Sequence, residues 1–270
     1  MSKRICSVYF SPTGGTKKVV NTISSVLGDK LSLPVDIFDF TLPKERENPL
    51  VFNSDDIVVI GTPVYAGRVP NVLLKFLDTI KGEGATAIPV VVFGNRNYDE
   101  ALCELSEICK KSGMKTITAG GFVAEHAFSY ILGKGRPDNE DIEKISEFAA
   151  LTAEKINNKG NDFENIEVDG GPVEKYYRPM DNEGNFIDIR KVKPKVNNKC
   201  NNCKKCVYVC PMGSISIENV SEYTGICIKC GACIKKCPTQ ARYYDDEGYI
   251  YHKTDLENSY ERRGEIKFFV

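Results

Sequence analysis

Eight of the eleven cysteines in this 270-residue chain lie between residues 200 and 237, in two runs of identical spacing. The first run is Cys200-x2-Cys203-x2-Cys206-x3-Cys210-Pro211, and the second is Cys227-x2-Cys230-x2-Cys233-x3-Cys237-Pro238. Such runs ligate 4Fe-4S clusters, and the cysteine before the proline binds the cluster of the other run. We therefore expect one cluster on Cys200, Cys203, Cys206 and Cys237. A second cluster is expected on Cys227, Cys230, Cys233 and Cys210.

Zinc is the main alternative to the iron-sulfur clusters, because paired Cys-x2-Cys elements also suit a tetrahedral zinc site. Zinc closes with four ligands, however, and gives no reason for two runs that each end in Cys-Pro. A disulfide framework fits less well, since disulfides are typical of small secreted chains. The other three cysteines, Cys6, Cys103 and Cys109, have no such spacing, and we expect them to be small buried residues.

Charge and hydropathy exclude several classes of protein. The 36 Lys and Arg balance 37 Asp and Glu, so the net charge of -1 creates no field that attracts nucleic acid or anionic lipid. No apolar stretch reaches the roughly 18 residues of a membrane span, and the apolar run at the N-terminus is too short for a signal peptide. We expect a cytoplasmic protein that binds neither nucleic acid nor membrane. The sequence leaves the oligomeric state open.

Residues 1–158 alternate short apolar runs with segments of helical period, which is the pattern of parallel strands joined by crossover helices. Five runs are predicted to be strands, at 5–10, 35–38, 57–60, 88–93 and 116–123. Helices are expected from Thr16 to a left-handed cap at Gly28, from Pro70 onward, before Gly113, and over 139–157. The pattern predicts an α/β domain with a doubly wound, five-stranded parallel sheet of order 2-1-3-4-5.

The rest of the chain divides into three parts. Residues 159–198 are polar and rich in Gly, Asn, Lys and Pro, and at roughly 40 residues this linker is long enough that we expect it to run along one domain. Residues 199–242 form a small α+β module with an internal repeat of 27 residues, from Cys200 to Cys227. Residues 243–270 are a C-terminal extension.

A loop rich in hydroxyl groups and glycine, Ser11-Pro12-Thr13-Gly14-Gly15-Thr16, joins the first strand to the first helix. Its backbone N–H groups can surround a phosphate at the positive end of the helix, and the hydroxyls of Ser11, Thr13 and Thr16 can add hydrogen bonds. The lysine of a Walker loop and the dinucleotide fingerprint are both missing, which leaves a phosphate monoester as the ligand. An ordinary turn is the alternative.

Two further loops follow the third and fourth strands, at 61–70 and 94–99. In a sheet of this order they flank the switch point, where a flat ligand lies. We expect an isoalloxazine ring between Tyr65 and Tyr98, although both tyrosines could simply cover the sheet. The expected contacts from these loops are Thr62, Pro63, Val64, Tyr65, Ala66, Gly67, Arg68, Gly94, Asn95, Arg96 and Tyr98.

Residues 1–158 resemble a flavodoxin, and nearly the whole chain is similar to the family of flavodoxin-ferredoxin fusion proteins. The resemblance rests on residues 62–70, 94–98, 125–126, 135–138 and 260–263. It implies FMN in the three loops, two 4Fe-4S clusters in a bacterial-type ferredoxin module, and electron transfer. Ordinary flavodoxins surround the flavin with acidic groups, whereas Arg68 and Arg96 lie in these loops. Positive charge there would favour the reduced anionic flavin.

These features predict an electron carrier in which clusters that pass single electrons are coupled to FMN, which takes one or two. Its donor and acceptor would be redox proteins that the sequence does not identify. One alternative is an FMN-dependent reductase of a small acceptor such as a quinone, a nitro compound or oxygen. Another is a redox sensor without catalytic activity. His126 follows the fifth strand and is a candidate proton source, or else a solvated loop residue.

Overall fold

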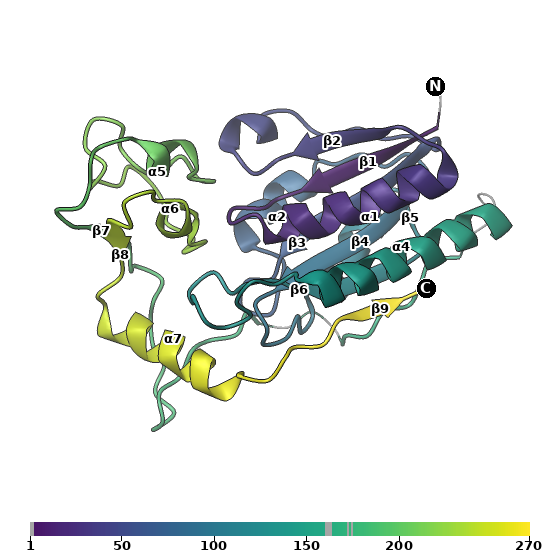
Figure 1. The fold of residues 1–270 in the computed structure, drawn as a ribbon. Coiled ribbons are helices and arrows are strands. Elements are labelled where there is room, and N and C mark those ends of the chain that lie inside the picture. The colour runs from purple at the N-terminus through teal and green to yellow at the C-terminus, as the bar shows by residue number, and fades with distance from the viewer. Residues whose placement is uncertain (1–2, 160–163, 172, 174) are drawn as a thin grey trace.

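The computed structural model describes residues 3–159, 164–171, 173 and 175–270. Its main sheet has the order β2-β1-β3-β4-β6-β9, and β5 pairs with β4 (Figure 1). The parallel strands are β1 (Arg4–Tyr9), β2 (Val35–Asp39), β3 (Asp56–Pro63), β4 (Thr86–Phe93), β5 (Lys115–Thr116) and β6 (Ala119–Val123). The predicted doubly wound order 2-1-3-4-5 is confirmed, with the fifth strand divided into β5 and β6.

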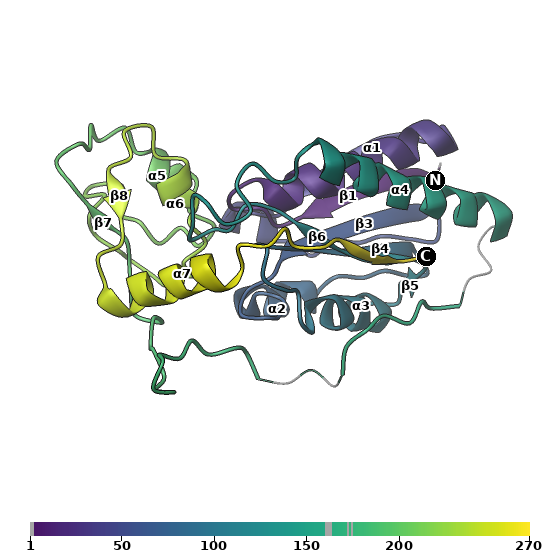
Figure 2. The ribbon, with the colours of Figure 1, turned by 60° about the horizontal axis from the view of Figure 1, so that its bottom comes forward.

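Each face of the sheet carries its own helices (Figure 2). The helices are α1 (Gly15–Leu31), α2 (Asn71–Leu77), α3 (Ala101–Lys111) and α4 (Asn139–Lys159), with a 3-10 turn η1 (Pro43–Arg46). Ile57 and Val59 of β3 pack in a core with α1 and α4, whereas Val58 and Ile60 pack with α2 and α3. Successive residues of a strand face opposite sides, so helices on both sides explain why β3 is apolar without alternation.

The first helix runs past the glycine that was expected to end it. α1 continues to Leu31, and the left-handed cap is Ser32, with φ of 52°. The expectation of a cap at Gly28 was wrong because this glycine has a packing role. A Cβ at Gly28 would lie 2.8 Å from Cγ2 of Val35, so its absence lets the helix approach β2.

The C-terminal extension returns to the first domain. After α7 (Glu247–Ser259), strand β9 (Lys267–Phe269) pairs antiparallel with β6, so that Gly120 lies opposite Phe268. This sixth strand of the path was not predicted. None of the helices formed by the described residues has an apolar stretch that would span a bilayer.

The small module shows its 27-residue repeat in the backbone. It contains the short helices α5 (Lys205–Tyr208) and α6 (Ala232–Lys235), and at its end β8 (Arg242–Tyr243) pairs with β7 (Lys195–Val196) at the end of the linker. Residues with positive φ recur at the repeat distance, in the pairs Asn202 and Lys229, Lys204 and Gly231, and Gly213 and Gln240. The N–H of Ser214 donates to Sγ of Cys210, and that of Ala241 donates to Sγ of Cys237, at 3.4 and 3.3 Å. The two halves therefore share one local fold.

Candidate functional site

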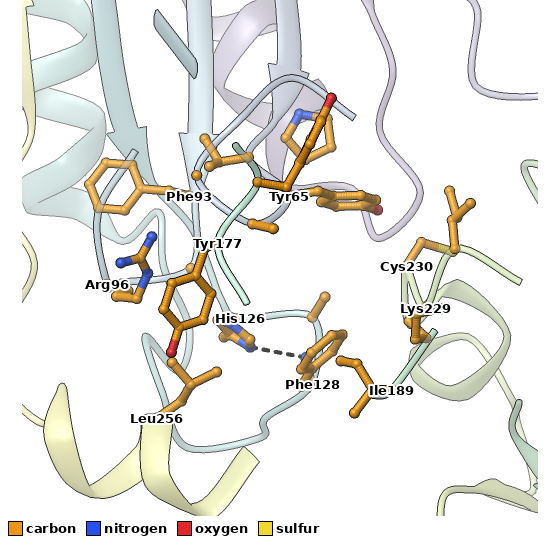
Figure 3. Close-up of a pocket in the computed structure, with 18 of the residues that line it drawn as sticks. Tyr65, Phe93, Arg96, His126, Phe128, Tyr177, Ile189, Lys229, Cys230 and Leu256 are labelled. Carbon is orange, nitrogen blue, oxygen red and sulfur yellow. Dashed lines mark hydrogen bonds between the residues drawn. The ribbon is translucent and has the colours of Figure 1, made fainter. Parts of the chain in front are cut away.

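A cavity of about 720 Å³ lies where the carboxyl ends of the strands meet the small module (Figure 3). Its walls come from the loops after β1, β3, β4 and β6, the linker, the second cysteine run and α7. This volume falls within the roughly 300–1,000 Å³ typical of ligand pockets. Ten of the predicted cofactor contacts line it: Thr13, Gly15, Thr16, Pro63, Val64, Tyr65, Ala66, Gly67, Gly94 and Arg96.

The start of α1, directly after the phosphate loop, lies at the wall of this cavity. Gly14, with φ of 106°, precedes the helix and has no side chain to cap its first turn. The Oγ of Ser11 accepts a hydrogen bond from the N–H of Lys17 at 2.9 Å, and this bond stabilises the conformation of the loop. Ser11 and Gly14 thus shape the loop, while Thr13 and Thr16 line the cavity. The positive end of a helix beside two hydroxyl-bearing residues suits a phosphate.

The loop after β3 is a tight hairpin turn held by the linker. Tyr65 and Arg68 exchange two backbone hydrogen bonds of 2.9 and 3.1 Å, and between them Ala66 and Gly67 have φ of 51° and 79°. Two central residues with positive φ are typical of a type I′ turn. The carbonyl of Ala66 accepts the N–H of Tyr177 at 2.9 Å, so the linker fixes this peptide.

Tyr65 connects this turn to the second cysteine run. Its ring points from the turn toward Cys230, which lines the same cavity (Figure 3). Burial raises the pKa of the Tyr65 hydroxyl well above its usual value, and the Cys230 and Cys227 thiols raise it further. Tyr65 therefore lies between the loops of the sheet domain and the cluster-binding module.

Tyr98 does not form the second wall of a ring sandwich. It is 8% exposed and packs on Phe93, with 5.7 Å between ring centroids. A Cβ on Gly121 would meet the Tyr98 ring at 2.6 Å, so this strand glycine makes room for the ring beside β6. The structure corrects the expected sandwich, because Tyr98 is a core residue and does not line the cavity.

Arg68 also faces away from the cavity. Its Nη2 lies 2.6 Å from Oε1 of Glu104, its Nε donates to Oε2 at 2.9 Å, and its guanidinium lies over the ring of Tyr176. This ion pair with α3 corrects the expectation that Arg68 tunes a flavin. Thr62 is likewise outside the cavity wall, buried within β3, and its Oγ1 has no hydrogen-bond partner among the described residues.

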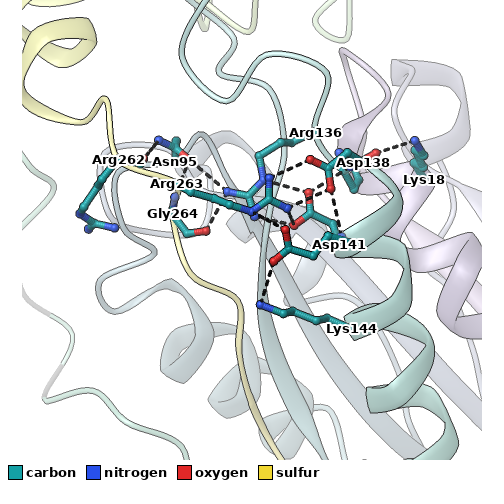
Figure 4. A network of polar contacts seen from close by, with 11 residues as sticks. Lys18, Asn95, Arg136, Asp138, Asp141, Lys144, Arg262, Arg263 and Gly264 are labelled. Carbon is teal, nitrogen blue, oxygen red and sulfur yellow. Dashed lines mark hydrogen bonds and ion pairs between the residues drawn. The ribbon is translucent and has the colours of Figure 1, made fainter.

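Asn95 is an anchor for the C-terminal segment rather than a cavity residue (Figure 4). Its amide donates to the carbonyls of Tyr260 and Arg262 at 2.8 and 2.7 Å. Its Oδ1 accepts the N–H of Gly264 at 2.9 Å and a hydrogen bond from Arg136 at 3.2 Å. The loop after β4 therefore holds the segment between α7 and β9, a role that the sequence did not suggest.

Arg96 and His126, a predicted cofactor contact and the candidate proton source, both line the cavity. Arg96 pairs with Asp99, and its guanidinium lies 5.0 Å from the ring centroid of Tyr177. Gly94 makes room for the histidine, since a Cβ there would lie 2.3 Å from Cδ2 of His126. The loops after β4 and β6 thus bring a cation and an imidazole to the same wall.

The imidazole of His126 is uncharged at neutral pH. Its Nδ1 accepts the N–H of Phe128 at 3.1 Å, so the ring proton is on Nε2. Burial, together with the nearby charges of His252, Lys235 and Arg96, lowers the pKa of His126 to about 4. A group with this pKa holds no additional proton to release at pH 7.

Four cysteines from both runs surround one small cavity inside the module: Cys210, Cys227, Cys230 and Cys233. Burial raises the pKa of Cys233 to about 12; Arg242 opposes this effect, and Cys227, Cys210 and Cys206 add to it. These four are the ligands expected for the cluster of the second run. No group of three or more His, Cys, Asp or Glu in the described part of the chain is placed to hold a single metal ion.

The other cysteines differ in exposure. Cys203 of the first run is exposed, while Cys200, Cys206 and Cys237 are half-buried. Outside the runs, Cys6 and Cys109 are buried, as expected for small apolar residues, whereas Cys103 is only half-buried.

Three close contacts join the small module to the sheet domain. Nζ of Lys235 lies 2.5 Å from Oε1 of Glu125, with the lysine side chain 13% exposed. The guanidinium of Arg46 donates to the carbonyl of Pro211 at 2.5 Å. A Cβ on Gly231 would lie 2.6 Å from the carbonyl oxygen of Ala127, so this glycine permits a close backbone approach.

Comparison with known protein families agrees with this two-part structure. Residues 7–100 match the family model described as flavodoxin domain, and residues 199–241 match the one described as 4Fe-4S dicluster domain. The chain therefore joins a flavodoxin domain to a 4Fe-4S dicluster domain, and we call it the fusion. A flavodoxin domain implies FMN, and a dicluster domain implies iron-sulfur clusters.

Curated relatives of the fusion match its ferredoxin part. Over 60 residues, 20% of the chain, it is 42% identical to an uncharacterized ferredoxin of Methanocaldococcus jannaschii. Over 44 residues, 16% of the chain, it is 39% identical to pyruvate synthase subunit PorD of Methanothermobacter marburgensis. These matches span 41% and 53% of the relatives' own lengths.

Solved flavodoxins are similar to the other part of the fusion. A flavodoxin from the domain Archaea aligns with a TM-score of 0.41 and 16% identity, over 57% of this chain and 99% of that one. Oxidised Flavodoxin 2 from Bacillus cereus aligns with a TM-score of 0.40 and 21% identity, over 56% and 99%.

The linker and α7 supply cavity residues that the sequence did not indicate. Tyr177, Ile189 and Arg190 of the linker and His252 and Leu256 of α7 all line the cavity. The linker has no hydrophobic period, so only its unusual length suggested that it runs along a domain. Its position is set by distant partners such as the carbonyl of Ala66.

Proposed function

We propose that the fusion is an electron-transfer protein that binds FMN in the large cavity and two 4Fe-4S clusters in the small module. The observation that carries this proposal is that Cys227 and Cys230 line the same cavity as the flavodoxin loops. The cluster of the second run would therefore lie next to the flavin. The cluster of the first run would lie farther out, because Cys200, Cys203 and Cys206 are absent from the cavity wall.

The residues around the cavity fit FMN by their chemistry. Thr13, Thr16 and the start of α1 would bind the phosphate. Tyr65 and Tyr177 present aromatic rings to the space where a flat ring system would lie. Bound FMN would supply electron transfer in steps of one or two electrons. The linker and α7 complete the wall of the cavity.

The small module likewise fits cubane clusters. A 4Fe-4S cubane takes four cysteine thiolates, and Cys210, Cys227, Cys230 and Cys233 surround one cavity. The backbone N–H groups of Ser214 and Ala241 donate to Cys210 and Cys237. Such donors stabilise a negatively charged sulfur. Each Cys-Pro cysteine therefore has a built-in hydrogen bond suited to a thiolate.

The decisive experiment is an anaerobic redox titration of the purified fusion, followed by visible absorbance and EPR. We expect about eight iron atoms and one FMN per chain, with electrons from the clusters appearing on the flavin. Zinc in place of iron, or a chain that does not bind FMN, would overturn the proposal. Steady turnover of a quinone or nitro compound without any protein acceptor would favour the reductase function.

Replacing Tyr65 with Leu is expected to weaken FMN binding roughly fivefold, because one ring contact contributes about 1 kcal/mol beyond its buried area. The affinity is measured by fluorescence titration of flavin-depleted protein with FMN. Tyr208→Leu is the matched control, since Tyr208 is 63% exposed and does not line the cavity. Equal affinities in the two variants would remove Tyr65 from the flavin site.

His126 predicts a pH dependence of stability. Its pKa is about 4 in the folded chain and near 6.5 when unfolded, so the unfolded state binds more protons between these values. Stability should therefore fall with decreasing pH, by about 2 kcal/mol between pH 7 and 5. We expect His126→Gln to lose this part of the dependence in urea unfolding followed by flavin fluorescence. Parallel pH curves for the two proteins would show that folding does not lower the pKa of His126.

A further inference from the structure

The charge of this chain is unevenly distributed. Residues 189–217 contain seven Lys or Arg and no Asp or Glu, although the formal net charge is -1. Two of the seven are already paired, Arg190 with Asp188 and Lys195 with Asp245, at 2.7 and 2.8 Å. The excess of positive charge therefore comes from the remaining five, which are Lys191, Lys193, Lys199, Lys204 and Lys205.

Four of these five lysines are exposed, and three of the four lie nearest to the first cysteine run along the chain. Lys193, Lys199 and Lys205 are all exposed, and within the described part of the chain none of them forms an ion pair. The first two lie just before the run and the third lies within it. These three lysines, together with Cys203 and Tyr208, are exposed side chains of one short stretch, residues 193–208, which we call the basic face.

The basic face is also where a cluster would come closest to solvent. Cys203 is the one exposed member of the eight run cysteines. Tyr208, at the end of α5, is 63% exposed. In contrast, Cys230 of the second run is buried beside the flavin cavity. The two runs thus present one inner and one outer position for electron exchange.

We propose that the basic face docks an acidic electron-carrier protein, which exchanges electrons with the cluster of the first run. This rests on the proposed function of the fusion. Positive groups around an exposed redox centre attract an acidic partner and orient it, and an exposed tyrosine suits the centre of such an interface. In each exchange the partner's reduced cluster loses one electron and the outer cluster gains it, and no bond is formed or broken.

The test compares two triple variants of the full, cluster-loaded chain. One is Lys193→Gln, Lys199→Gln and Lys205→Gln; the control is Lys30→Gln, Lys75→Gln and Lys111→Gln, which removes the same charge from exposed lysines on α1, α2 and α3. The probe is an acidic two-cluster ferredoxin. Its oxidised form is used for calorimetric binding, and its reduced form for stopped-flow reduction of the clusters.

We expect wild-type binding and rate to fall as salt rises, because exposed charges are screened. At low salt the first variant should lose roughly tenfold or more in affinity and rate, and the control should match wild type. Iron content per chain checks that both variants keep their clusters. If the first variant loses iron, Lys191→Gln with Lys193→Gln repeats the test outside the cysteine run.

Rates and affinities that respond neither to salt nor to the first variant would overturn the docking proposal. Tight binding of an RNA oligonucleotide or of a basic c-type cytochrome, with none of the acidic ferredoxin, would also overturn it. Flavin absorbance is followed in the same mixing experiment. Clusters that are reduced normally while the flavin stays oxidised would overturn the proposed function and leave the docking site intact.

Discussion

Replacing Cys210 with Ala is expected to remove the cluster of the second run, although Cys210 belongs to the first run. Cys210 lines one small cavity with Cys227, Cys230 and Cys233, so its loss leaves that set with three thiols. We expect about half of the iron to be lost. Reduction of the flavin by electrons delivered to the clusters should be abolished, because the lost cluster is the one beside the large cavity.

The reciprocal variant provides the matched comparison. Cys237→Ala should remove the outer cluster, since the expected partners of Cys237 are Cys200, Cys203 and Cys206. In iron analysis and in EPR of the reduced protein, Cys210→Ala should therefore give the same result as Cys227→Ala. Cys237→Ala should likewise give the same result as Cys200→Ala. If Cys210→Ala instead resembles Cys200→Ala, each run holds its own cluster. The position of Cys210 in the structure would then have no bearing on ligation.

The features that the sequence predicted correctly are those that depend on local pattern. The strands of the parallel sheet are apolar runs, and the 27-residue repeat reappears as paired backbone conformations. The phosphate loop follows from its position between a strand and a helix. Helix ends are set by finer packing, and Gly28 shows that a glycine can serve close approach instead of termination.

The directions of side chains could not be predicted in the same way. Tyr65 and Tyr98 stand in similar loops, yet only Tyr65 lines the cavity. Asn97 Oδ1 accepts the N–H groups of Tyr98 and Asp99, and this turn places Tyr98 against β6. Gly121 was the available signal, since a glycine within a strand often marks the close approach of another group.

The direction of the charged Arg68 side chain could not be predicted from its loop either. Its partner Glu104 is buried on α3 among apolar residues, and a buried carboxylate requires a cation or hydrogen-bond donors. That requirement could have indicated an ion pair within the domain. The linker and β9, by contrast, are positioned by partners far away in the chain, which no local pattern reveals.

The second large effect is expected at the buried ion pair that holds the C-terminal segment (Figure 4). Arg136 and Asp141 are 8% and 0% exposed, and Nε of Arg136 donates to Oδ2 of Asp141 at 2.8 Å. Nη1 of Arg136 donates to the carbonyl of Gly264 at 2.7 Å, and Arg263 contacts Asp141 at 3.0 Å. One carboxylate thus joins the start of α4 to the segment that leads into β9.

Asp141→Ala should therefore lower the free energy of unfolding by about 3–5 kcal/mol, since it leaves the buried guanidinium of Arg136 without its counterion. Urea unfolding followed by circular dichroism measures this loss, and hydrogen exchange should show faster opening of β9. Lys144→Ala is the control, because its pair with Glu140 is exposed and such pairs contribute at most about 1 kcal/mol.

A double variant separates the charge from the packing. Arg136→Met with Asp141→Leu removes both charges and keeps most of the buried volume, so it should be clearly more stable than Asp141→Ala alone. If the double variant binds FMN as wild type does, the ion pair serves stability and not the cavity. If Asp141→Ala unfolds at the same urea concentration as Lys144→Ala, the C-terminal segment is held instead by two other features. These are the hydrogen bonds between the Asn95 side chain and the backbone of the segment, and the pairing of β9 with β6.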